Sequence, residues 1–259
     1  MTRVLLFYIA LFIFVGAQSI PGQEVQGLKD RRVSLDFEQK PLGVVLEYLI
    51  VKYDIPVGLE QSTLDNGHGD YDFGTNLPMA ASITGQNIEG AKVRIMSQKS
   101  YERFSHLLTI RAENEPLTEV LDTIVKQMKN YSWRIEDDVV NIFPSKGQDE
   151  RLRRMLDMTV KSFIFNGGTV GDITTKIKTL DELKDFLEQN NLVFTGVRNG
   201  SEMLLKARYD RQIDSKMKFS DIKFRNLLNQ ITKVKRGGWI VKFVRVYNAQ
   251  PRHKIDIDI

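Results

Sequence analysis

The residues best able to do chemistry stand in one polar stretch, where His68 lies among Asp65, Asp70 and Asp72. Carboxylate oxygens bind hard cations such as calcium, so a cation site is one interpretation of this cluster. The spacing does not match a calcium-binding loop, because no glutamate stands eleven positions after Asp65 or Asp70. Loop polarity explains the same residues, and we assign no metal ligand from them.

The other two histidines give no catalytic pattern. His106 precedes an apolar stretch and His253 lies near the C-terminus, and both are typical of surface residues. The sequence contains no glycine-rich phosphate loop, no HExxH and no GxSxG motif. We therefore expect a protein without enzyme activity, and we assign no catalytic, cofactor-binding or metal-binding residue.

Cysteine is absent from the 259 residues. This excludes disulfides, thiol catalysis and thiolate metal sites, and it excludes a lipid anchor attached to a cysteine. The composition is that of an ordinary globular protein, with 42% hydrophobic and 27% charged residues.

The C-terminal third is basic. Residues 206–254 hold 14 Lys and Arg against 3 acidic residues, a local net charge of +11. Several of these cations interleave with aromatic residues, as a contact surface for an anionic polymer would. The alternative is a solvated face with aromatic residues such as Trp239 in the core. The residues concerned are Arg208, Arg211, Lys233, Lys235, Arg236, Arg245, Tyr209, Trp239 and Tyr247.

The elements that would carry any such site are repeated. The stretch at 108–121 (LTIRAENEPLTEVL) superposes on the stretch at 33–46 (VSLDFEQKPLGVVL) with a shift of 75 positions. In each copy alternating apolar residues indicate a half-buried strand, and apolar residues at i, i+3, i+4 and i+7 then indicate a helix. Pro41 and Pro116 suit the start of a helix, where a missing N–H costs nothing. Each copy therefore predicts a strand, a tight turn and an amphipathic helix.

A degenerate third copy of the strand-helix segment lies at 217–231 (MKFSDIKFRNLLNQI). Phe224, Leu227, Leu228 and Ile231 take the helical positions, and Lys223 stands where the proline was. Alternating residues on both sides of Asp137-Asp138 predict a β-hairpin, as do those flanking Arg198-Asn199-Gly200-Ser201.

These elements predict an α+β fold of repeated strand-helix-strand units, which form small mixed sheets packed on two helices. We expect a linker at 18–31, a domain at 32–147 with an insertion at 61–106, and a second α+β domain at 148–259. One interpretation of the second domain is a diverged copy of the first. The charged stretch at 145–154 is the boundary between them. Long insertions are often functional, so the 61–106 segment is a candidate contact region.

The N-terminus predicts export. Arg3 precedes a 12-residue apolar run at 4–15, which is shorter than the ~20 residues that span a bilayer. Small residues follow, so we expect a signal peptide over 1–17, cleaved near Ala17, with an uncleaved anchor as the alternative. The mature chain would then be periplasmic or secreted, without a transmembrane span.

The first half resembles the short N-terminal domain shared by bacterial secretins and TonB-dependent receptors. The resemblance covers about residues 32–144 and rests on the two strand-helix segments and the hairpin at 131–143 (YSWRIEDDVVNIF). The insertion departs from the short link of that family. The C-terminal part of FecR-type regulators is a related possibility. The resemblance implies a small domain for protein–protein contact in the periplasm.

Two functions of different classes follow. The first is an exported interaction module of a secretion, pilus or receptor assembly, which docks a protein partner of the cell envelope by strand addition at exposed sheet edges. The second is an envelope binder of an anionic polymer (nucleic acid, lipid headgroups or cell-wall polymer) through residues 206–254.

Overall fold

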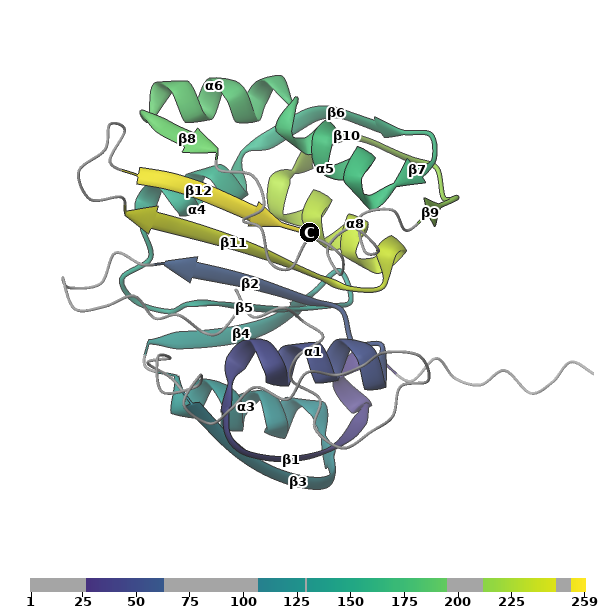
Figure 1. Ribbon diagram of the computed structural model, residues 1–259, viewed down its shortest axis with the longest axis vertical. Helices are drawn as coiled ribbons and strands as arrows, with labels where there is room; N and C mark the ends of the chain where they lie inside the picture. The colour runs from purple at the N-terminus through teal and green to yellow at the C-terminus, as the bar shows by residue number, and fades with distance from the viewer. Residues whose placement is uncertain (1–26, 63–106, 129, 195–211, 246–252) are drawn as a thin grey trace, which may run out of the picture.

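The fold was analysed in a computed structural model that describes residues 27–62, 107–128, 130–194, 212–245 and 253–259. It is an α+β fold, as predicted, with helices packed between small sheets (Figure 1). The first unit (residues 27–144) and the second unit (residues 150–259) each have a hydrophobic core of their own.

The first unit contains two strand-helix segments. β1 (Arg32–Pro41) and β3 (Leu107–Pro116) pair antiparallel, and each leads directly into a helix, α1 (Leu42–Tyr53) or α3 (Leu117–Gln127). Pro41 and Pro116 are the residues that precede the two helices, with extended backbone angles. The sequence repeat therefore does correspond to a structural repeat.

The remaining strands of this unit lie on the other side of the two helices (Figure 1). They are β2 (Val57–Ser62), β4 (Tyr131–Glu136) and β5 (Val139–Pro144). β4 and β5 form the expected hairpin around Asp137-Asp138, and β2 runs parallel to β5. Leu42, Leu49, Leu117 and Leu121 are fully buried between the two sheets.

The segment expected as a linker contributes to this core. Residues 28–30 form a short 3-10 helix, and Leu28 is buried with the first unit. The Arg31 side chain donates to the carbonyl oxygen of Tyr53 at 2.6 Å, and this ties the chain entry to the end of α1. The rest of that segment lies outside the described residues, as do residues 63–106 of the insertion.

The second unit contains more elements. Its helices are α4 (Glu150–Asp157), α5 (Val170–Lys178), α6 (Asp181–Gln189) and α8 (Phe224–Lys235). Its strands are β6 (Thr159–Phe165), β7 (Gly168–Thr169), β8 (Leu192–Phe194), β9 (Gln212–Ile213), β10 (Met217–Lys223), β11 (Gly238–Arg245) and β12 (His253–Asp258).

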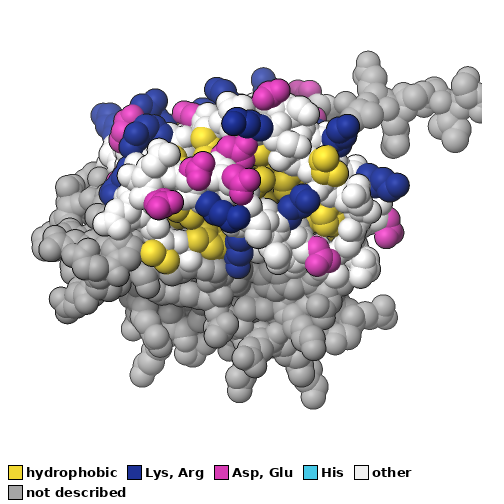
Figure 2. Space-filling view, turned by 90° about the horizontal axis from the view of Figure 1, so that it is seen from above, with side chains coloured by type: hydrophobic (Ala, Val, Ile, Leu, Met, Phe, Trp, Pro, Cys, Tyr) yellow, Lys and Arg dark blue, Asp and Glu magenta, His cyan; other side chains and the backbone are white. Residues whose placement is uncertain are grey.

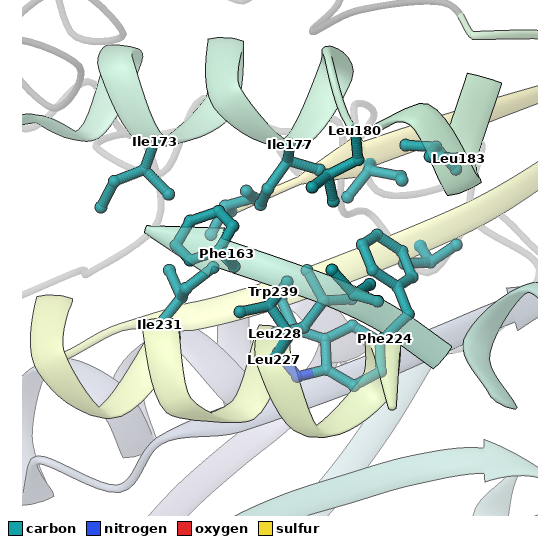
Figure 3. Packing of buried hydrophobic residues seen from close by; sticks show 14 of the residues in the cluster. Phe163, Ile173, Ile177, Leu180, Leu183, Phe224, Leu227, Leu228, Ile231 and Trp239 are labelled. Carbon is teal, nitrogen blue, oxygen red and sulfur yellow. The ribbon is translucent and has the colours of Figure 1, made fainter. Parts of the chain in front are cut away.

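The core of the second unit lies between its two layers of strands. Figure 3 shows Phe163 of β6 and Ile173 and Ile177 of α5 on one side, with Trp239 and residues of α8 on the other. Phe224, Leu227, Leu228 and Ile231 of α8 are all fully buried, so the apolar spacing of the third copy is confirmed as a helix face.

The strands have the same arrangement in both units. The order β4-β5-β2 of the first unit recurs as β11-β12-β8 in the second, in each case an antiparallel hairpin followed by a parallel strand. The antiparallel pair β1-β3 likewise recurs as β6-β10. In this arrangement α8 corresponds to α3, although the apolar spacing alone also aligned it with α1.

The two sets of strands join into one sheet of six, in the order β4-β5-β2-β11-β12-β8 (Figure 1). The junction, where β2 pairs in parallel with β11, was not apparent from the sequence. Val57 and Leu59 of β2 lie in the first core, while Trp239 of β11 packs on the intervening Gly58 and lies in the second. Because side chains alternate along a strand, the helices of the two units cover opposite faces of the sheet.

Candidate interaction surfaces

Only some of the candidate functional residues of the sequence lie in the described part of the chain. His68, Asp65, Asp70, Asp72 and His106 lie outside the described residues. The backbone of His253 in β12 is in register with that of Arg245 in β11. Within the described part of the chain, no three His, Cys, Asp or Glu side chains are grouped so that they could hold a metal ion.

The basic C-terminal third is divided between surface and interior. Trp239 is 1% exposed and belongs to the core, as the alternative interpretation expected for it. Lys235 is also buried, and its Nζ donates to the carbonyl oxygen of Gly238 at 2.5 Å. Lys233 pairs with Asp138 of the first unit at 3.1 Å. These three residues therefore serve the fold, and Arg208, Arg211, Tyr209 and Tyr247 lie outside the described residues.

Charges of both signs cover the end of the second unit that carries α6. Figure 2 looks onto this end and shows Lys and Arg interspersed with Asp and Glu, with small hydrophobic areas between them. A mixed surface of this kind is typical of a solvated face, and it does not concentrate the field of one charge.

The junction is held by a close approach of two strands. A Cβ atom on Gly58 would lie 2.3 Å from Cε2 of Trp239, and one on Gly238 would lie 2.9 Å from the carbonyl oxygen of Val57. Only glycine therefore fits at these two positions without a shift of the neighbours. The indole covers Gly58, and its Nε1 donates to Oδ1 of Asn229 on α8 at 2.8 Å.

A buried ion pair crosses the same junction. Glu60 of β2 is fully buried and pairs with Arg225 of α8, which is 5% exposed. Gln148 donates to the other carboxylate oxygen of Glu60, and Asp157 lies 3.8 Å from the guanidinium. Burial lowers the pKa of Arg225 to about 10, so the group is still a cation at neutral pH. Buried charges require such partners, and this pair joins β2 of the first unit to α8 of the second.

A second group of side chains links α1 to β1. The Tyr53 hydroxyl accepts from Ser34 N at 2.8 Å and donates to Ser34 O at 2.9 Å. Tyr48 packs edge-on against Phe37, and Lys52 Nζ lies 4.9 Å from the centre of the Tyr48 ring. The hydrogen bond with Tyr48 raises the pKa of Lys52. These contacts fix the end of a helix, and we see no binding geometry in them.

The outer strands of the six-stranded sheet are the remaining surfaces. Among the described residues β4 lies at one end of the sheet and β8 at the other. The turn residues Asp137 and Asp138 both have positive φ, as in the two-residue turns that join tight hairpins. In such a hairpin Glu136 and Val139 form the hydrogen-bonded pair, so the backbone groups of Trp133 and Ile135 point away from β5.

Part of this geometry has a signal in the sequence and part has none. Helix α5 was missed, although Thr169 and Asp172 form a capping box at its start. Glu60 and Arg225 could not be paired from the sequence, because 165 positions separate them and both resemble ordinary surface residues.

The comparisons with known proteins give no further assignment. No protein-family model, curated protein or solved structure matches the chain. As for the membrane, the described part of the chain has no helix that is long and apolar enough to cross it.

Proposed function

We propose that this chain is an exported, non-catalytic interaction module that docks onto a protein assembly of the cell envelope by strand addition. The observation that carries the proposal is the six-stranded sheet, which the molecule builds by joining two units edge to edge. Among the described residues the sheet ends in β4. The outward backbone groups of β4 have the same arrangement as those of β11, the strand that pairs with β2 at the junction. Strand addition supplies main-chain hydrogen bonds to a partner without any catalytic group.

Two features of the sequence support the compartment and the class of partner. The apolar run at 4–15 after Arg3 is typical of a cleaved export signal. The repeated strand-helix segments resemble the short N-terminal domain of secretins and TonB-dependent receptors, and that resemblance implies a contact domain in the periplasm.

The proposal is tested by recovery of the protein from its own cells. The full chain carries a C-terminal affinity tag, and the envelope is extracted gently after chemical cross-linking. We expect a mature N-terminus near Ala17 and one partner protein in stoichiometric amount. A version without residues 1–17 is the control, because it stays in the cytoplasm and reports contacts that form only after lysis. A clean monomer with an intact N-terminus would contradict the proposal.

A further inference from the structure

The two tryptophans of the chain occupy equivalent places. Trp133 lies on β4 and Trp239 on β11, the first strands of the two hairpins. Trp133 Nε1 donates to Asp122 of α3 at 2.7 Å, and Trp239 Nε1 donates to Asn229 of α8 at 2.8 Å. Asp122 and Asn229 are each the sixth residue of their helix. The same strand, indole and helix contact is therefore present in both units.

In the second unit a parallel strand, β2, already pairs with β11 beside this contact. The N–H of Val57 donates to the carbonyl oxygen of Gly237 at 3.3 Å, and Gly58 is paired with Trp239 across the junction. Trp239 is 1% exposed as a result, since the backbone at Gly58 lies on its ring. The equivalent Trp133 is only half-buried, and β4 is an outer strand among the described residues.

We infer that the outer edge of β4 is a docking site for a partner protein, which adds an extended strand parallel to β4 with a glycine over Trp133. The inference rests on the proposed function and specifies the site and the chemistry of the partner segment. The outward backbone groups of Trp133 and Ile135 would supply the hydrogen bonds, as those of Trp239 do toward β2.

The helix beside the edge specifies a further position of the partner strand. Glu60, two residues after Gly58, meets Arg225, which is the second residue of α8. The second residue of α3 is Thr118, and Asp122 stands where α8 has Asn229. A carboxylate two residues after the glycine would therefore meet Thr118 in place of the counterpart of Arg225, and an uncharged or basic residue fits better.

A second copy of this chain is a poor occupant. Its outer strand β8 directs Leu192 and Phe194 into its own core, so Val193 faces outward, as Gly58 does on β2. Val193 is 38% exposed and branched at Cβ. A side chain of that size would occupy the space that Gly58 leaves for the indole. The glycine requirement therefore favours a strand from a different protein.

The probe is a labelled peptide with the sequence of residues 55–62 and the change Glu60→Gln, titrated onto the full chain by fluorescence anisotropy. We expect saturable binding at one site per chain. The peptide with Gly58→Val should bind at least about tenfold more weakly, because its side chain meets the indole of Trp133. The unchanged peptide with Glu60 should bind more weakly than the probe.

N-methylation of the probe separates strand addition from other binding without changing the protein. Val57 N–H points toward β11, and Pro56 O accepts from Val140 on the other side, so alternate residues of this strand bond to opposite neighbours. N-methyl groups at positions 59 and 61 should reduce affinity at least about tenfold, and those at 58 and 60 should leave it nearly unchanged.

A pair of protein variants locates the site. Trp133→Leu should lose the binding, while Val51→Ser, on an exposed position of α1, should keep it. Equal effects of the two N-methylation patterns would overturn the inference. Full binding to Trp133→Leu would also overturn it, because the peptide would then have replaced β2. Self-association that Trp133→Leu abolishes would also overturn it, in favour of a second copy. If a stoichiometric envelope partner is recovered but the peptide does not bind, the docking site is elsewhere and the proposed function stands.

Discussion

Individual residues at the junction carry more of the architecture than their types suggest. Gly58 leaves room for the ring of Trp239, and Glu60 supplies the counter-ion of Arg225. Both lie on β2 and face the second unit, so one short strand belongs to the first core through one set of side chains and to the second through the other. The union of the units is therefore sensitive to single substitutions in β2.

Replacing Gly58 with alanine is expected to destabilise the protein by about 1–3 kcal/mol, because the added methyl group must displace the indole of Trp239. Gly27→Ala is the matched control, since a Cβ there meets its nearest atom at 3.4 Å. Urea unfolding of the two variants measures the difference. An equal loss in both would show that the close approach at the junction has no energetic weight.

Breaking the ion pair at one side is expected to cost about 3–5 kcal/mol, because Glu60→Leu or Arg225→Met leaves a buried charge without its partner. The double variant should be more stable than either single one. A double-mutant cycle from urea unfolding gives the coupling energy between the two residues. Additive losses would mean that water replaces the missing partner at this position.

At the scale of elements, the strand-helix segment is the repeating component. α3 and α8 follow their strands without a loop, and both present apolar residues at i, i+3, i+4 and i+7 to a core. The proline that precedes α3 is replaced by Lys223 before α8, and the extended backbone is retained at that position. The apolar spacing, and not the proline, is therefore what the helix requires.

A charged residue introduced at equivalent core positions of either unit should unfold the protein. Leu121→Asp and Leu228→Asp each bury an unpaired carboxylate at a position without solvent access, which is expected to cost more than about 4 kcal/mol. Val51→Asp is the control, because Val51 is 54% exposed on α1. Circular dichroism during thermal unfolding gives the result. Cooperative unfolding of Leu121→Asp near the temperature of the parent would contradict the core described for the first unit.

At the scale of the whole molecule, the two units share one sheet. β11 contributes Trp239 and Val241 to the second core, while its Ile240 packs against the first. Asn229 of α8 donates to the carbonyl oxygen of Glu136 at 3.4 Å, and Lys233 pairs with Asp138, so the hairpin of the first unit is also held by the second. At the junction each unit is therefore covered by residues of the other.

This arrangement predicts a single unfolding transition for the full chain, with equal calorimetric and van't Hoff enthalpies. The fragment 149–259 is expected to be unstable alone, because it would expose Trp239 and the edge of β11. Differential scanning calorimetry tests the first statement and solubility of the fragment the second. Two separate transitions would show that the units fold independently despite the common sheet.

Local patterns were sufficient for the parts of the fold that depend on neighbours in the chain. The alternation of β1, β3 and the β4-β5 hairpin and the spacing of α1, α3 and α8 are visible in the sequence, because a side chain's face follows from the period of its element. The α+β class follows from these elements.

The junction required the tertiary structure, because strand pairing depends on residues far apart in the chain. Gly58 reads as a weak position in a strand until Trp239 is seen on it, and Trp133 reads as one more aromatic residue of a hairpin. Their equivalence emerges only when β4 and β11 are seen in the same place in two units. Periodicity in a sequence determines which face of an element is buried, and only the assembled sheet determines which edges are joined and which remain outermost.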